Sequence, residues 1–384
     1  NNAQESDLNA LNDLDKWIDN QVNGTTGGNT TGGDANPSTT PKISTLVETV
    51  VDKNTKAEDA YGNKITIPKG FKILEHNPTS STGAVTYNYT NSEETGEHIP
   101  AVQDGIVIEN GTDGNQFVWV PVGTINNKTG DSKGATSTIT LGRYEFDSST
   151  GVLKSNTPAQ VASVENCTQE VTINTYYKEL STSRGGNSAE DSTAQNATAR
   201  NLSEFISTTL ANGGYYIARF EASGTASKIT SKYDQTVLTK ITQPNAAKLA
   251  REMYGEIKEN NKLVYASDLV NSYAWDTAII FIQTYSVKTD YARHNESITT
   301  GEFTATGKNN DKYCNIWDMA GNASEWTTEY STHSVGSYFF PCVSRGGCYN
   351  TASGGAIFCT SFRNADYTTS SNSRYGLRPL LYVK

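Results

Sequence analysis

Residues 315–326 read Asn-Ile-Trp-Asp-Met-Ala-Gly-Asn-Ala-Ser-Glu-Trp, and this stretch decides the fold. Its Gly321-Asn322 pair accepts the positive φ angles of a tight turn, so we expect the chain to reverse there. Trp317 and Trp326 bring two large rings that we expect to be buried. Glu325 is a candidate partner for loop amides or for a cation. For each of these residues, a purely structural role in holding the loops together is the alternative.

Five further segments accompany this stretch in a fixed order. Two are strong strand predictions, one belongs to an apolar helix, and two are glycine-containing turns. They are Phe117-Val118-Trp119-Val120-Pro121, Gly214–Glu221 (GYYIARFE), Ala274-Trp275-Asp276, Arg345-Gly346-Gly347 and Gly376-Leu377-Arg378-Pro379. Together the six segments resemble the formylglycine-generating-enzyme (sulfatase-modifying factor) family over residues 115–384. The resemblance implies an α+β, C-type-lectin-like fold with few regular elements and long loops.

The resemblance also indicates a protein without the family's enzymatic activity. The enzymes of this family bind copper through two cysteines that follow the Gly-Gly turn, and those places hold Thr351 and Ala356 here. Neither side chain forms a thiolate, so neither binds copper(I) or exchanges a disulfide. Cys348 and Cys359 lie nearby at other spacings, and their use as substitutes would make the protein a divergent oxidase. The four histidines show no metal-ligand spacing.

One metal remains an expectation from the resemblance. Some members of the family bind calcium beside the segment quoted first, and Asn322 and Glu325 stand at the matching places. Amide and carboxylate oxygens are suitable calcium ligands. No other cofactor is expected.

The C-terminal tail, residues 330–383, has an unusual composition. These 54 residues contain no Glu, Lys, Gln, Trp or Met, although the five types supply 59 of the first 329 residues. They are the amino acids that no codon ending in C or T encodes. A Ser- and Gly-rich loop that merely lacks long side chains, with several of its rings in the core, is the alternative explanation.

The tail resembles the variable proteins of diversity-generating retroelements, in which template AAC or AAT codons are rewritten at adenines. The resemblance places variable residues in the segment 348–375, on an exposed face of the fold. Tyr, Asn and Ser side chains there are typical of a protein-binding paratope. The candidate ligand-binding residues are Tyr349, Asn350, Thr351, Ala352, Ser353, Phe358, Thr360, Phe362, Asn364, Ala365, Asp366, Tyr367, Ser371, Asn372, Ser373 and Tyr375.

The remaining sequence predicts the domain order. Residues 1–22 form one amphipathic helix, which resembles the end of a pilin-like or membrane-anchor segment, and residues 23–42 form a Gly- and Thr-rich tether. Residues 43–114 form a small β-rich region with strands near 65–67 and 105–108, and residues 115–384 form the lectin-like domain. Within that domain, residues 123–205 are a polar insertion. Helices are predicted for 244–254 and 267–284, the second beginning with a Ser or Asp cap.

Composition restricts the partners. The net charge of -10 and pI near 5.0, without a Lys/Arg cluster, exclude nucleic acid and anionic membranes. Five cysteines without a CxxC pair predict scattered small apolar residues with one disulfide at most, and at least one unpaired thiol. We expect an extracellular or cell-surface bacterial receptor or adhesin that binds a protein or glycan and is anchored, if at all, through a removed N-terminal segment. A carbohydrate-binding module of fixed specificity is the alternative.

Overall fold

The structure, a computed structural model, describes residues 40–74, 101–147, 149–181, 197–295, 303–349 and 359–384. The helix predicted for residues 1–22, and residues 23–39 of the predicted tether, lie outside these residues and stay predictions. The described residues form a mixed α+β structure with three α-helices and many short strands. None of the described helices is both long and apolar enough to pass through a membrane.

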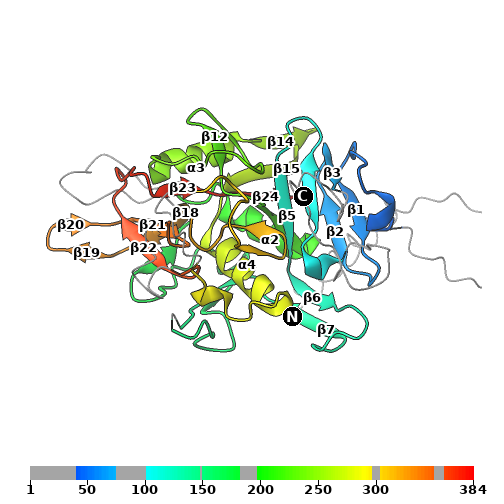
Figure 1. Cartoon of the computed structure of the whole chain (residues 1–384), viewed down its shortest axis with the longest axis horizontal. Coiled ribbons are helices and arrows are strands. Elements are labelled where there is room, and N and C mark those ends of the chain that lie inside the picture. Colours follow the sequence, from blue (N-terminus) through cyan, green and yellow to red (C-terminus); the bar gives the residue numbers. More distant parts are fainter. Residues whose placement is uncertain (1–39, 75–100, 148, 182–196, 296–302, 350–358) are drawn as a thin grey trace, which may run out of the picture. The chain divides into compact units, whose positions relative to one another are not determined.

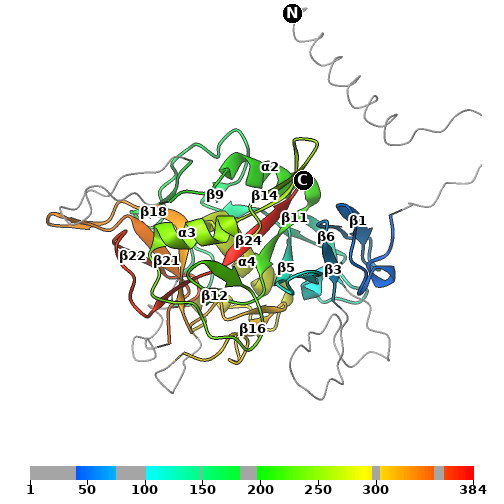
Figure 2. The ribbon, with the colours of Figure 1, turned by 90° about the horizontal axis from the view of Figure 1, so that it is seen from above.

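Seven antiparallel strands form the larger sheet. β5 (Gln116–Pro121) and β11 (Gly214–Ala218), the two strands predicted most strongly, pair with Val118 opposite Ile217. Every residue of both strands is buried, which agrees with their nearly continuous apolar sequence. The strand order is β14 (Glu256–Glu259), β15 (Lys262–Leu269), β24 (Pro379–Val383), β11, β5, β4 (Val107–Asn110) and β3 (Phe71–Ile73). The C-terminal strand β24 therefore lies inside the sheet (Figure 2).

The region 43–114 is β-rich, but a boundary at residue 114 does not separate it from the rest. β1 (Thr55–Glu58) and β2 (Lys64–Ile67) form a hairpin, whereas β3 and β4 extend the seven-stranded sheet. Ile43 and Val383, near the two ends of the described chain, belong to the same hydrophobic core. Residues from Thr40 to Lys384 thus form one compact unit.

Three helices pack against this sheet and its neighbours. α2 (Leu202–Asn212) lies against β11 and β24, and α3 (Gln243–Glu252) lies against β15. α3 agrees with the predicted 244–254 helix and is capped by Thr242, whose hydroxyl accepts the Asn245 amide. α2 was not predicted, because its buried face combines only three large apolar residues with Thr208 and Thr209 in a segment taken as a polar insertion.

The prediction for the start of α4 was wrong. This helix spans Ser272–Tyr285 and is capped by Asn271, whose side chain accepts the Ala274 amide. Ser267 and Asp268, the predicted caps, belong instead to β15 and pair with Leu381 and Leu380 of β24. Pairing with the sheet therefore outweighs the local capping signal.

A second sheet carries most of the C-terminal tail. Its order is β10 (Tyr177–Glu179), β18 (Ser324–Ser331), β21 (Cys342–Arg345) and β22 (Arg363–Asp366), with β23 (Tyr375–Leu377) parallel to β18. The polar insertion supplies β10, together with β6 (Gly123–Asn126), β7 (Thr136–Ile139), β8 (Gly142–Arg143) and β9 (Gln160–Val161). A hairpin of β19 (Ser334–Val335) and β20 (Tyr338–Phe339) extends from the end of this sheet (Figure 1). The part of the tail from β19 to β22 thus forms one end of the structure (Figure 1), whereas β24 returns to the larger sheet.

Shorter hairpins complete the chain. β12 (Ser223–Thr225) pairs with β13 (Lys228–Thr230), and β16 (Lys312–Tyr313) pairs with β17 (Ile316–Trp317). The predicted turn at Gly321-Asn322 is present, with φ angles of 97° and 52°. Trp326 is buried as expected, but Trp317 is only partly buried. Its ring lies beside Phe220 and under the Lys312 ammonium, near the surface.

Candidate ligand-binding site

β22 brings tail residues to the edge of the second sheet. It pairs with β21 through Arg345 opposite Arg363 and Ser344 opposite Asn364. Arg363 is buried, whereas the three residues that follow it are partly exposed. The backbone of β22 is therefore fixed by the sheet while most of its side chains reach the surface.

A small hollow of about 160 Å³ lies beside β22. Its walls are Ser324, Cys348, Phe362, Asn364, Asp366, Arg374 and Tyr375. The Tyr375 hydroxyl donates to Asp366 and accepts from the Asn364 amide at 3.0 Å. Burial, followed by the nearby Asp366 carboxylate, raises the pKa of Tyr375, so the hydroxyl keeps its proton. The polar side chains of the small hollow are therefore already hydrogen-bonded to one another.

A larger hollow of about 420 Å³ also borders Phe362. It is lined by Phe146, Asp147, Lys154, Asn174, Tyr176, Tyr177, Cys359, Ser361, Phe362 and Arg363. Its volume is in the range of small-molecule pockets, about 300–1,000 Å³. Phe362 lines both hollows, so they are neighbours, and we treat them together as one candidate site beside β22.

A buried ion network holds Arg363, a residue that borders the larger hollow, in place. Arg363 lies 2.6 Å from Asp276 of α4 and 2.9 Å from Glu329 of β18. Arg143 pairs with Glu329 at 2.8 Å, and Arg345 pairs with Asp276 at 2.6 Å. Burial disfavours ionisation of Glu329, but the three arginines outweigh it and hold its pKa at about 2. Arg363 is thus committed to the scaffold, although its side chain borders the larger hollow.

The structure distributes the predicted binding residues unevenly. Phe362, Asn364, Asp366 and Tyr375 line the hollows. Ser371 and Asn372 are exposed, and Tyr349, Ala365, Tyr367 and Ser373 are partly buried. Asn350, Thr351, Ala352, Ser353 and Phe358 lie outside the described residues, as does Ala356.

Two predicted contact residues are buried. Thr360 is fully buried, and its carbonyl oxygen accepts the indole N–H of Trp275 at 2.9 Å. Tyr375 is only 3% exposed, and its ring stacks on Trp326 with centroids 4.2 Å apart. Thr360 is therefore a core residue rather than a contact residue. Tyr375 presents only its hydroxyl to the small hollow, because the ring belongs to the core.

The residues expected to bind calcium are engaged elsewhere. Both carboxylate oxygens of Glu325 accept from Arg378, at 2.6 and 2.8 Å. Asn322 donates to Glu221 and accepts the Thr304 amide at 3.1 Å. Burial, then the charges of Asp318 and Glu325, raise the pKa of Glu221 well above its usual range. In the described part of the chain, no group of three or more His, Cys, Asp or Glu could hold a metal ion.

All five cysteines lie in the described part of the chain, and the structure shows no disulfide among them. Cys342, Cys348, Cys359 and Cys167 are buried. Cys314 is partly buried, and desolvation raises the pKa of its thiol. Buried thiols behave as small apolar residues, which agrees with the packing role expected from the sequence.

Several residues of the larger hollow were missed by the sequence analysis. Tyr176 and Tyr177 lie in the polar insertion, and β10 brings them beside β18 by pairing Tyr177 with Ser331. Phe146 and Asn174 come from the same insertion. The one available signal was two adjacent tyrosines within a polar segment, which is typical of binding surfaces.

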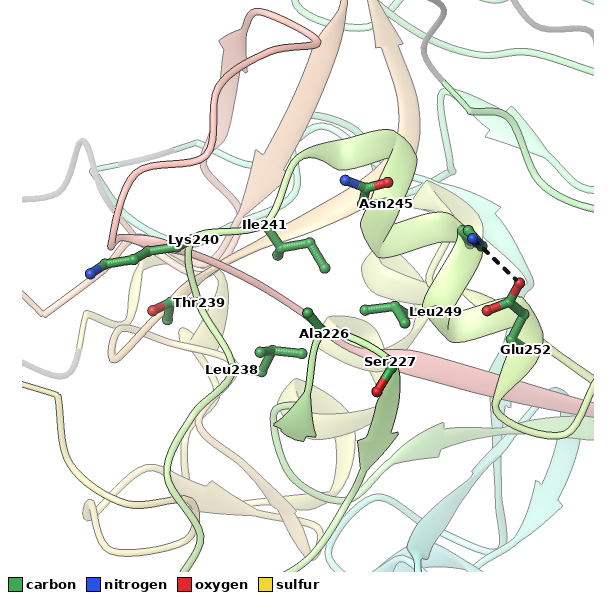
Figure 3. Close-up of a pocket in the computed structure, with 10 residues that line it drawn as sticks. Ala226, Ser227, Leu238, Thr239, Lys240, Ile241, Asn245, Leu249 and Glu252 are labelled. Atoms are coloured by element: carbon green, nitrogen blue, oxygen red, sulfur yellow. Dashed lines mark ion pairs between the residues drawn. The ribbon is translucent and has the colours of Figure 1, made fainter.

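A third hollow, of about 330 Å³, lies between the β12–β13 turn and α3 (Figure 3). Leu238, Ile241 and Leu249 face its centre, whereas the Lys240 side chain extends away from them. It shares a small core with Trp326, whose indole N–H donates to the Ile241 carbonyl at 2.7 Å. It contains no cluster of titratable groups suited to catalysis.

The chain is similar to one family of known proteins and to two solved structures. A model of the sulfatase-modifying factor enzyme 1-like domain matches residues 105–381. The crystal structure of CarF is similar at 15% identity with a TM-score of 0.31, covering 44% of this chain and 87% of CarF. Treponema denticola variable protein 1 is similar at 13% identity with a TM-score of 0.26, covering 71% of this chain and 97% of that protein. No curated protein matches the chain.

Proposed function

Because the chain belongs to the family of the sulfatase-modifying factor enzyme 1-like domain, we propose that it is a ligand-binding member of that family that performs no catalysis. Its binding face is the C-terminal tail, displayed on a C-type-lectin-like scaffold and diversified by a retroelement. Thr351 and Ala356 support the absence of catalysis, since neither can supply the thiolate that copper chemistry requires.

One observation carries the proposal: the tail without Glu, Lys, Gln, Trp or Met also forms β22 and the junction of two surface hollows. At the rate of the first 329 residues, about ten residues of those five types would be expected in it. A template of AAC and AAT codons rewritten at adenines produces this exclusion. The biased residues and the surface cavities therefore coincide.

The tail also contains the anchors that a variable surface needs. Arg345, Arg363 and Arg378 are buried, and each pairs with a carboxylate that lies outside the tail. Asn364 and Asp366, by contrast, are held through their backbone pairing with β21. Side chains at these partly exposed positions can change without breaking the strand pairing or the ion network.

We place the protein at the cell surface, where residues 1–22 would adjoin an anchor and residues 23–42 would hold the binding face away from the membrane. Only composition supports this part of the proposal. Cleavage of the protein on intact cells by an added protease tests it. Protection of the protein in intact cells, with cleavage only after lysis, contradicts it.

Sequencing the 3′ end of the gene from many cells of one population tests the diversification. Adenine-templated substitutions confined to codons 348–375, with codons 117–221 unchanged, are the expected result. A uniform tail would leave a binder of fixed specificity. Copper(I) uptake with oxidation of a thiol peptide by the purified chain would contradict the absence of catalysis.

A further inference from the structure

A continuous row of aromatic rings runs along the surface beside the larger hollow. Successive ring centroids lie 4.7 to 6.3 Å apart. In order of contact, this aromatic row consists of Tyr177, Tyr176, His333, Phe340, Tyr367 and Tyr338. Three separate parts of the chain supply it: β10 with the turn before it, the β19–β20 hairpin with its flanks, and the turn after β22. Tyr176 is 39% exposed and Tyr338 is 47% exposed, so both present ring surface to solvent.

The inner end of the aromatic row is held in place by the backbone. Ile173 and Tyr177 exchange backbone hydrogen bonds at 2.8 and 2.9 Å across a tight turn. Asn174 and Thr175 in that turn have φ angles of 48° and 73°. The carbonyl of Tyr176 accepts the Thr332 amide at 2.9 Å. Since these bonds order the turn in advance, a ligand loses little free energy in ordering it.

The aromatic row and the larger hollow share Tyr176 and Tyr177, so a ligand on one would reach the other. The hollow adds neutral polar groups, among them Asn174 and Ser361, to the ring surfaces of Phe146 and Phe362. Flat apolar surface beside neutral donors and acceptors suits a ligand that has both apolar faces and many hydroxyl groups.

The charged groups around the hollow already have partners. Asp147 and Lys154 at the rim have opposite charges. Lys154 also lies 3.7 Å from Glu145, and Arg363 is neutralised by Asp276 and Glu329. Asp147 has no ion-pair partner among these groups, but its carboxylate already accepts hydrogen bonds from the Ser149 and Thr150 amides. An anion placed here would find only cations that are already paired, and a cation would find a carboxylate that is already hydrogen-bonded. Because ions are costly to desolvate without such a partner, a neutral ligand is favoured.

We propose that the aromatic row and the larger hollow bind a neutral oligosaccharide. The apolar faces of the sugar rings stack on the Tyr and Phe rings, and the sugar hydroxyls bond to the polar groups of the hollow. The inference rests on the proposed function, because it names the ligand class of the same face. Tyr176 and Tyr177 precede the biased tail, so they form a part of the site that stays constant while tail residues set the specificity.

Binding of the purified full chain to an array of neutral and anionic oligosaccharides, followed by titration with the neutral oligosaccharide that binds best, tests the inference. Tyr176→Ala and Tyr338→Ala are each expected to weaken binding roughly 3- to 10-fold, the effect of losing one stacked ring. Tyr176→Phe keeps the ring and should retain most of the affinity. Leu210→Ala, at a 46% exposed position on α2, is the matched surface control and should leave binding unchanged.

Three results would overturn the inference: no binding to any neutral oligosaccharide at millimolar concentration, selection of anionic glycans alone, or unchanged affinity in both Ala variants. Circular dichroism of each variant distinguishes lost contacts from lost folding. The experiments distinguish a failure of this inference from a failure of the proposed function. A diversified tail without saccharide binding removes the ligand class and keeps the display role, whereas saccharide binding with a uniform tail keeps the ligand class and removes diversification.

Discussion

The guanidinium of Arg363 in the tail lies 2.6 Å from the carboxylate of Asp276 in α4, and both side chains are buried. Arg363 also pairs with Glu329, so a single residue ties the edge strand β22 to a helix and to the centre of the second sheet. Asn364, the next residue in the chain, faces the small hollow. Scaffold and candidate binding surface therefore meet between two consecutive residues.

Arg363→Met should destabilise the protein strongly. The substitution leaves Asp276 and Glu329 with fewer partners in a buried site, which costs about 3 kcal/mol of the free energy of unfolding. Urea denaturation followed by fluorescence measures it. Arg374→Ala, at an exposed arginine of the same tail, is the control and should change stability by less than about 0.5 kcal/mol. Equal effects of the two substitutions would show that the ion network does not anchor the tail.

Asn364→Ser should leave stability nearly unchanged and alter ligand binding. The side chain is partly exposed and makes one hydrogen bond, to the Tyr375 hydroxyl, so its loss costs about 1 kcal/mol or less. Thermal unfolding and binding to the selected ligand are measured on the same preparation. A fall in stability as large as that of Arg363→Met would place Asn364 in the scaffold and contradict its assignment to the binding face.

Glu329 makes the free energy of unfolding depend on pH in the acid range. Its pKa is about 2 in the folded chain against 4.5 ordinarily, so unfolding takes up a proton at intermediate pH. The stabilisation, about 3 kcal/mol by linkage, is fully present above pH 4.5 and is lost as the pH falls toward 2. Urea denaturation at a series of pH values measures this loss.

Glu329→Gln is the matched variant for the acid dependence. It removes the titrating group and keeps the size of the side chain, so it should be less stable at neutral pH and show a shallower decline in acid. An identical pH dependence in the variant and the wild type would assign acid sensitivity to other carboxylates.

The sequence predicted those parts of the fold that depend on local pattern. β5 and β11 follow from continuous apolar runs, and the turn at Gly321-Asn322 follows from residues that accept positive φ. The buried ring of Trp326 is equally local in origin. Such features can be predicted without knowing which distant segment of the chain packs against them.

Features that depend on distant pairing were not predictable. Tyr176 reaches the candidate site because β10 joins the edge of β18, and no periodicity in the polar insertion indicates that partner. Tyr375 resembles a surface residue in its Ser- and Asn-rich surroundings, yet stacking on Trp326 buries it. Contacts between distant segments therefore decide whether such a residue lies on the surface or in the core.

Gly346→Ala should destabilise the turn between β21 and the 348–375 segment more than a similar substitution in the exposed hairpin. Gly346 has φ of 90°, and a Cβ there would lie 2.6 Å from the carbonyl oxygen of Met319. Gly336, in the β19–β20 turn, also has a positive φ, of 61°, but a Cβ there meets nothing within 4 Å. Both variants carry the conformational penalty of about 1 kcal/mol, so the difference between their stabilities measures the close approach to Met319.

We expect Gly346→Ala to lower the free energy of unfolding by at least about 1 kcal/mol more than Gly336→Ala, since the Met319 carbonyl belongs to a buried turn and cannot move freely. Thermal unfolding of the two variants measures this difference. Equal losses in the two variants would mean that the contact between the Gly346 turn and the 315–326 stretch is loose, and that the two segments are not held together by close packing.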